Sequence, residues 1–99
     1  MAIRKNLSAD SSNIELIPKR SGISGNIKKI IINNTDGSNA LVVTHLDHFD
    51  GSNEFQIISN VNIPVGASLV LSDNIAFDSN IYALRITTSN SATSTIIIN

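Results

Sequence analysis

Residues 34–63, NTDGSNALVVTHLDHFDGSNEFQIISNVNI, decide the fold class of this chain. Two runs in which apolar and polar residues alternate, 40–48 and 54–63, are separated by the tetrapeptide DGSN, which also stands at 36–39. Alternation with a period of two is typical of half-buried strands, and Asp-Gly favours tight turns because glycine accepts a positive φ. The stretch therefore predicts antiparallel strands, with the two DGSN turns bracketing the middle strand of a three-stranded meander.

Similar runs lie on both sides of this stretch, and none shows the sustained 3.6-residue period of a helix. A short β-like run is expected at 14–17, and the strands expected in the domain proper are 26–33, 40–48, 54–63, 67–71, 81–88 and 93–98, with 75–77 as a further short strand. Six or seven such strands predict an all-β fold, either an antiparallel β-sandwich or a small jelly-roll-like barrel. We expect strand 54–63 to shift register near residues 58–60. The turn residues expected to shape the fold are Gly37, Gly51, Pro64 and Gly66.

The composition agrees with a single small β domain. The chain has 99 residues, of which 17 are Ile, and Asn, Ser and Thr together make 33, a mixture that suits strands and turns better than helices. There is no Cys, so neither disulfides nor thiolate metal sites hold the fold. No apolar run approaches the ~18 residues of a membrane span, and the first ten residues lack the apolar centre of a signal peptide. We therefore expect a protein that is made in the cytosol and has no membrane contact.

Charge is divided unevenly along the chain. Residues 1–29 carry six basic and two acidic residues, whereas residues 30–99 carry one basic and six acidic residues. The net charge of −1 and the lack of aromatic residues among the basic ones argue against nucleic-acid binding. A basic segment on an acidic body is able to dock on an acidic neighbour, including another copy of itself.

We therefore predict an extended basic N-terminal arm over residues 1–25 that precedes a β-sandwich domain over residues 26–99. The alternative is a solvated tail whose basic residues aid solubility. The arm residues expected to contact neighbouring subunits are Arg4, Lys5, Lys19 and Arg20.

The motif H-x-D-H-x-D contains the candidate metal ligands His45, Asp47 and His48. Imidazole and carboxylate groups suit a transition metal, but successive residues of a strand point to opposite faces. His45 and Asp47 would then point one way and His48 the other. A His–Asp pair on a solvent-facing strand is the simpler interpretation, and we expect no metal and no cofactor.

The two DGSN segments, with Asp36 and Asp50, also imitate a calcium loop with oxygen ligands. They are much shorter than a helix-flanked calcium loop, and Asp-Gly turns are common without an ion. The chain has no G-x-S-x-G motif, no phosphate-binding glycine loop and no carboxylate pair in an apolar setting. We therefore expect that the protein is not an enzyme.

Two of the expected strands, 27–33 and 93–98, are apolar on both faces. One face of each belongs in the core, and the other is available to a neighbouring subunit. An unpaired edge at residues 96–98 would promote aggregation. The pattern favours a homo-oligomer or a protein present in multiple copies.

Residues 60–71, NVNIPVGASLVL, together with DNIAFD at 73–78 and YALRITTS at 82–89, resemble small structural proteins of tailed bacteriophages, particularly cyanophage-type virions. The shared pattern is a strand that ends in Pro-x-Gly, an LVL strand, and a Tyr-x-Leu-x-Ile strand before a Ser/Thr-rich end. It covers residues 26–99. The resemblance implies a non-enzymatic virion protein, assembled in the host cytoplasm as a head decoration or cement subunit or as a head-neck-tail accessory subunit.

The partners that this resemblance implies are other virion proteins, namely the major capsid, portal or neck, or tail proteins, with the arm docking on them. An alternative is a receptor- or carbohydrate-binding module of a tail fibre. Sugar sites usually present stacking aromatic residues, and most of the four in this chain are expected in the core. These four are Phe49, Phe55, Phe77 and Tyr82.

Overall fold

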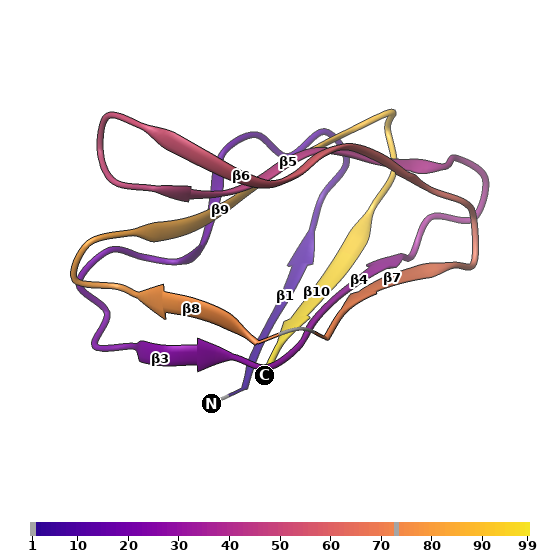
Figure 1. Cartoon of the computed structure of the whole chain (residues 1–99). Coiled ribbons are helices and arrows are strands. Elements are labelled where there is room, and N and C mark those ends of the chain that lie inside the picture. The colour runs from indigo at the N-terminus through magenta and orange to yellow at the C-terminus, as the bar shows by residue number, and fades with distance from the viewer. Residues whose placement is uncertain (1, 73) are drawn as a thin grey trace.

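The computed structural model describes residues 2–72 and 74–99, and in these ranges it contains ten strands and no helix (Figure 1). The strands are β1 (Ile3–Leu7), β2 (Ile14–Ile17), β3 (Ser24–Ile27), β4 (Ile30–Asn34), β5 (Leu41–Phe49), β6 (Glu54–Ile63), β7 (Ser68–Leu71), β8 (Ile75–Asp78), β9 (Ala83–Ser89) and β10 (Ser94–Ile98). The predicted all-β class is confirmed, but the predicted number of six or seven strands is wrong.

Every strand pair is antiparallel, and the strands form three sheets. The first sheet has the order β1-β10-β4-β7, the second has the order β2-β9-β5-β6, and β3 pairs with β8 alone. The two four-stranded sheets face each other across the core, and the β3–β8 pair extends one end of the layer below the second sheet (Figure 1). This arrangement is consistent with a β-sandwich.

The core lies between the sheets because alternate residues of each strand point inward. On the two central strands of the first sheet the inward residues Ile30, Ile32, Ile96 and Ile98 are at most 1% exposed. Burying a side chain of this size contributes roughly 1.5–3 kcal/mol. Their neighbours Ile31 and Ile97 lie on the outer face and remain partly exposed, as the pattern of two apolar faces predicts.

Strand 26–33, predicted as one element, is divided into β3 and β4. Between them the backbone N–H groups of Lys28 and Lys29 both donate to the Asn99 carbonyl, at 2.9 and 3.0 Å. These hydrogen bonds fix the point where the pairing changes: β3, before it, pairs with β8, and β4, after it, pairs with β10 and β7. One half of the predicted three-stranded meander is confirmed, because β5 and β6 form a hairpin. The other half is wrong, because β4 and β5 lie in different sheets.

The separate N-terminal arm over residues 1–25 is not confirmed. Within the described residues 2–25, β1 pairs with β10 and β2 pairs with β9, each as an edge strand. Leu7, Leu16 and Ile17 belong to the hydrophobic core. The segment 96–98 therefore has a strand on each side, which removes the edge that the sequence alone would leave open.

The second sheet contains two irregularities that orient the side chains of β5. The pairing of β5 with β6 shifts between Leu46 and Asp47, close to the predicted position, and the pairing with β9 shifts between Val43 and His45. Beyond them Leu46 and His48 share the inner face, opposite the core residues of the neighbouring strands. His45 and Asp47 point outward.

The predicted turn residues differ in backbone conformation. Gly51 and Gly66 have φ of 107° and 78°, which glycine adopts readily, whereas Gly37 is not among the positive-φ residues. Pro64 begins a tight turn in which its carbonyl accepts a hydrogen bond from the Ala67 N–H at 3.1 Å. The two DGSN segments thus share a sequence but not a conformation.

Candidate docking surface

A charged cluster lies on the outer face of the second sheet. Asp47 is fully buried, and its carboxylate accepts from Arg85 Nη2 at 3.1 Å and lies 3.3 Å from His45 Nδ1. The same Arg85 atom contacts Glu54 Oε1 at 2.7 Å, and the guanidinium covers the Phe49 ring at 3.7 Å from its centroid. The prediction that His45 and Asp47 share a face is confirmed, but the prediction of a solvent-facing pair is wrong because Asp47 is fully buried and paired with Arg85.

The candidate ligands His45, Asp47 and His48 are not brought together. His48 lies on the opposite face of β5, where it packs against Phe77 and Tyr82. Among the described residues, no group of three or more His, Asp or Glu side chains is placed to hold a metal ion. The partner of Asp47 is the guanidinium of Arg85 on the neighbouring strand, so this contact stabilises the register of β5 and β9.

The carboxylates of the DGSN turns are occupied by the backbone. Asp36 Oδ2 accepts from the N–H groups of Ser38 and Asn39, at 3.0 and 2.7 Å. Asp50 Oδ1 accepts in the same way from the second and third residues after it, at 2.8 and 2.6 Å. These backbone hydrogen bonds lower the pKa of both carboxyl groups. Such contacts are what Asp contributes to a turn without any bound ion.

The four basic residues predicted to make contacts lie in two separate segments. Arg4 and Lys5 are on β1, and the Lys5 ammonium lies 3.4 Å from the Glu15 carbonyl of β2. Lys19 and Arg20 lie in the loop after β2, where Lys19 Nζ donates to the Asp50 carbonyl at 2.9 Å. All four side chains are exposed.

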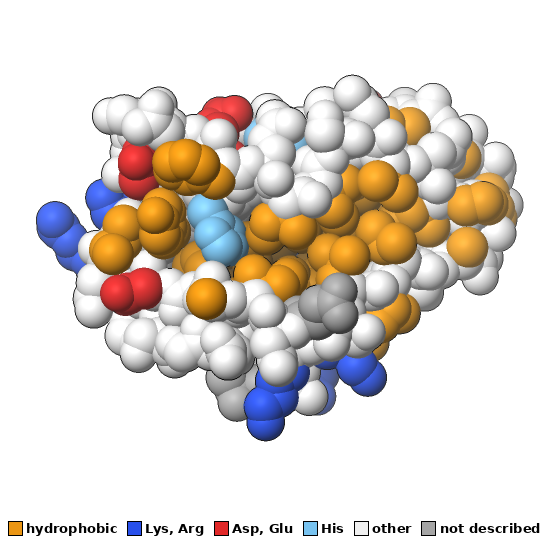
Figure 2. Space-filling view, in the orientation of Figure 1, with side chains coloured by type: hydrophobic (Ala, Val, Ile, Leu, Met, Phe, Trp, Pro, Cys, Tyr) orange, Lys and Arg blue, Asp and Glu red, His pale blue; other side chains and the backbone are white. Residues whose placement is uncertain are grey.

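In the part of the chain that the structure describes, one long side of the sandwich is covered by no further strand. The edge strands β6 and β7 lie on this open side, with β8 beside them, and their inward-facing residues are only partly buried (Figure 1). We name these residues the apolar band. The band consists of the partly buried Ile57, Val61, Leu69 and Leu71 on these strands, the exposed Phe55 on β6, and Tyr82, which lies between β8 and β9. Figure 2 shows it as a continuous stretch of hydrophobic side chains around one histidine.

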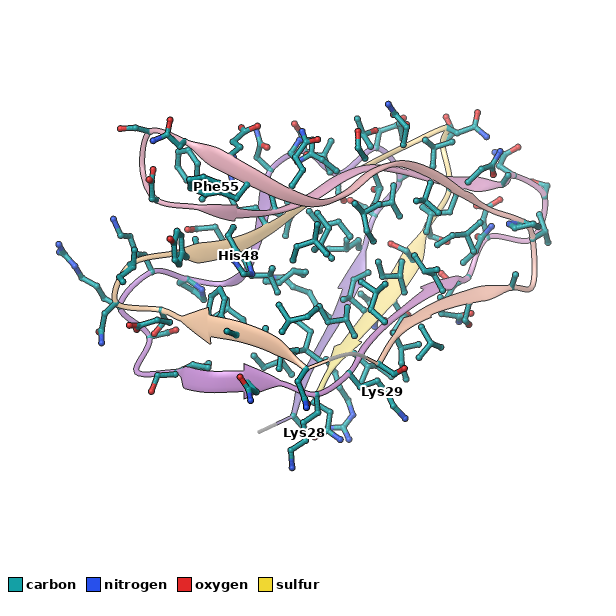
Figure 3. The ribbon with its side chains drawn as sticks, in the orientation of Figure 1. Lys28, Lys29, His48 and Phe55 are labelled. Carbon is teal, nitrogen blue, oxygen red and sulfur yellow. The ribbon has the colours of Figure 1, made fainter. Side chains whose placement is uncertain are left out.

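The aromatic end of the band is a series of four rings. Phe55 meets the edge of Tyr82 at 6.1 Å between centroids, Tyr82 lies 5.5 Å from His48, and His48 lies 5.2 Å from Phe77. Phe55, at the outer end, is 52% exposed. Figure 3 shows Phe55 on the uppermost strand and His48 below it, at the same end of the molecule.

His48 is the polar member of this end. Its Nε2 is buried and has no hydrogen-bond partner. Burial lowers the pKa of His48, and the nearby Asp47 charge opposes this effect in part. The neutral imidazole is therefore favoured, and it behaves as one more ring of the band.

The described residues form no pocket, so the band is a surface and not a cavity. It is suited to packing against another surface, because partly buried aliphatic and aromatic side chains lose their remaining water on contact. Sequence reasoning placed most of the four aromatic residues in the core and missed the band. The alternation of Phe55 and Ile57 shows in the sequence that they share a face of the strand. The sequence does not show that β6 is an edge strand, because strand order is a property of the topology.

Comparison with known proteins adds no further assignment. No family model matches the chain, and neither a curated protein nor a solved structure matches it. Among the residues that the structure describes, there is also no helix that could span a membrane.

Proposed function

We propose that this protein is a non-enzymatic structural subunit of a tailed-bacteriophage virion, which is built into the particle through its apolar band. The observation that carries the proposal is the band itself. Phe55, at its aromatic end, is 52% exposed, beside residues that are only partly buried. A continuous apolar surface bounded by polar residues is typical of a protein–protein contact.

The type of particle comes from the sequence resemblance at residues 60–71 and 82–89. In the structure these residues include β7 and β9, so the resemblance falls on elements that build the two sheets. A sandwich-type fold of ten short strands with a buried ion pair is a rigid unit, which suits repeated assembly. The subunit would act as a head decoration or cement, or as a head-neck-tail accessory, after assembly in the host cytoplasm.

The partners in this proposal are the major capsid, portal or neck, or tail proteins, together with further copies of the chain. The exposed side chains of Arg4, Lys5, Lys19 and Arg20 would add contacts to acidic neighbours at the periphery, where such charges set orientation more than affinity.

Quantitative mass spectrometry of gradient-purified particles tests the proposal. We expect the chain to remain with the particles at a fixed ratio to the major capsid protein. A copy number close to that of the major capsid protein indicates a decoration protein. A copy number equal to that of the subunits of a single ring indicates a neck or tail protein. Loss of the chain from the particles during purification at moderate salt would overturn the proposal.

A carbohydrate-binding module of a tail fibre is the second candidate, because Phe55 and Tyr82 are accessible at one end of the band. Ring faces beside polar groups are what sugar sites use. Glycan-array binding by the isolated chain that is lost in Phe55→Ala would favour this candidate, whereas the absence of binding to any glycan would exclude it.

A further inference from the structure

We propose that β1 is exchanged between two copies of this chain, so that the β1 strand of each copy pairs with β10 of the other. In the first sheet β1 and β7 are the two opposite edges, and only β7 borders the apolar band. The exchange therefore uses a different part of the molecule from the surface on which the proposed function rests, and either can fail without the other.

The pairing of β1 with β10 identifies the second copy as the partner. All five residues of β1 pair with β10 in antiparallel register, with Ile3 opposite Ile98. β10 ends in three consecutive Ile residues, so its edge needs a strand that covers it. Because two copies have the same sequence, β1 of one copy offers the other copy's β10 the same register, backbone hydrogen bonds and side chains.

β1 can leave its own chain without disturbing the other strands. It is both the first strand of the chain and an edge strand, so no other element has to be unthreaded. Three of its five residues are exposed, and it contributes to the core through Leu7 and, in part, Ile3. Lys5 also contacts the Glu15 carbonyl of β2 at 3.4 Å, and an exchanged strand reproduces this contact.

The chain from Leu7 to Ser11 is the hinge of the exchange. Figure 1 shows the chain rising from the end of β1 in the first sheet toward the second sheet. Ser11 is fixed, because it is buried and its carbonyl accepts from the Thr88 N–H at 2.8 Å. Between the two ends of the hinge, Ala9 and Asp10 form a turn in which Asp10 has φ of 56°.

The backbone of Asp10 favours an open hinge. A positive φ is unfavourable for residues with a side chain, although Asp tolerates it better than most. Opening the turn returns Asp10 to an extended backbone, and a short hinge that is strained when closed promotes exchange. The closed turn is held by Ser91, whose N–H and hydroxyl donate to the Asp10 carboxylate at 3.0 and 3.5 Å. Both residues are exposed, so water can replace these hydrogen bonds.

Protein concentration decides which form is populated, because the closed and the exchanged forms contain the same strand pairings. A short linker keeps β1 at an effective concentration in the millimolar range near its own β10. Exchange therefore competes with closure when several copies fold close to one another.

Two engineered cysteines test the exchange, since the chain has no Cys of its own. Asn6 and Thr95 stand opposite each other on β1 and β10, and the Thr95 hydroxyl donates to Asn6 Oδ1 at 2.7 Å. The variant Asn6→Cys/Thr95→Cys is refolded from urea at about 1 µM or about 1 mM and then oxidised. On non-reducing gels we expect a disulfide within one chain at the low concentration and between two chains at the high one.

Asn33 on β4 and Ser68 on β7 form a matched control pair. They also stand opposite each other in the first sheet, and the Ser68 hydroxyl donates to Asn33 Oδ1 at 2.8 Å. Neither strand is at an end of the chain, so Asn33→Cys/Ser68→Cys should form its disulfide within one chain at both concentrations. A disulfide between positions 6 and 95 that joins two chains no more often than the control pair would overturn the inference.

Asp10→Val and Asp10→Gly test the hinge. Both remove the carboxylate and its contacts with Ser91, but only glycine accepts a positive φ freely. Asp10→Val should therefore reach the same dimeric fraction at about tenfold lower protein concentration than Asp10→Gly. Sedimentation velocity after refolding measures the fractions, and circular dichroism checks that both variants fold. Equal dimeric fractions would contradict the assignment of the hinge.

Purified particles distinguish the exchange from the proposed function. A cysteine variant that is present in particles but has its disulfide within one chain, there and after refolding at high concentration, overturns the exchange and leaves the proposed function intact. A chain that exchanges β1 in solution but is absent from particles overturns the proposed function alone.

Discussion

Asp47 on β5 and Arg85 on β9 stand directly opposite each other in the second sheet, and the Arg85 Nη2 donates to Asp47 Oδ2 at 3.1 Å. The carboxylate is fully buried and the guanidinium side chain is 11% exposed. A buried carboxylate that loses its partner remains as an uncompensated charge, which costs more than the pair itself contributes. The pair therefore makes the register of β5 and β9 sensitive to either residue.

Arg85→Met should lower the free energy of unfolding by about 3–5 kcal/mol, because it leaves the buried Asp47 charge without its guanidinium partner. Asp47→Asn in the same chain should restore part of this loss. Glu54→Gln is the control: that side chain is 44% exposed, so its contact with Arg85 should contribute about 0–1 kcal/mol. Urea unfolding followed by circular dichroism measures all three. Equal losses for Arg85→Met and Glu54→Gln would contradict this account of the cluster.

The two DGSN turns should respond differently to alanine. Gly51 has φ of 107°, a region that side chains disfavour, and Gly51→Ala should lower the free energy of unfolding by about 1–3 kcal/mol. Gly37 does not have a positive φ, and no atom lies within 4 Å of an added Cβ. Gly37→Ala should leave stability unchanged or raise it by up to about 1 kcal/mol. Thermal unfolding of the two variants compares them directly, and an equal destabilisation would show that the turns are alike.

Stability should decrease on acidification in a way that depends on His48. Its pKa is lowered by burial, so the unfolded chain binds a proton that the folded chain does not. The sign follows: the contribution is fully present above the unfolded pKa of about 6.5, falls as the pH drops below that value, and levels off below the lowered folded pKa. His48→Phe should remove this component from urea midpoints between about pH 7 and pH 5. An unchanged pH profile in His48→Phe would argue against a buried neutral imidazole.

Removal of residues 1–25 should unfold or aggregate the protein, because β1 and β2 are edge strands of the two sheets and Leu7 and Ile17 lie in the core. The deletion also exposes the Ile-rich edge of β10. Arg4→Glu/Lys5→Glu changes the charge of β1 without removing it and should remain soluble and folded. A deletion variant that is soluble, with an intact β spectrum, would restore the predicted free arm.

The local pattern was sufficient for most strands and for one irregularity. The alternation in β5, β6 and β9 is recognisable within a few residues, and so are the apolar runs of β4 and β10. Every second side chain of a strand points to the same face, so the sequence itself shows which residues face inward. The shift in β6 was predictable because residues 57 and 58 are both Ile, so the alternation is interrupted there.

What could not be predicted depends on contacts between distant residues. The pairing of β1 with β10 joins the two ends of the chain, and no local signal marks it. The break between β3 and β4 depends on the Asn99 carbonyl, which accepts from Lys28 and Lys29. Asp47 alternates as an outward polar residue should, and only the opposing Arg85 explains its burial.

The candidate surface was missed for a related reason. Phe55 and Tyr82 are large aromatic residues with the alternating spacing of core residues, and their side chains do face inward. They are accessible because β6 and β7 are the last strands of their sheets, which is a consequence of strand order and not of any residue in the band.

A competition experiment in the assembling particle tests the central claim most directly, namely that the apolar band attaches this subunit. Wild type and one variant are supplied in equal amounts to the same assembly, and mass spectrometry measures their ratio in purified particles. We expect Phe55→Asp to be depleted by about tenfold or more, corresponding to ~1.4 kcal/mol of lost contact, and Val65→Asp to match the wild type. Incorporation of Phe55→Asp at the wild-type ratio would contradict the account.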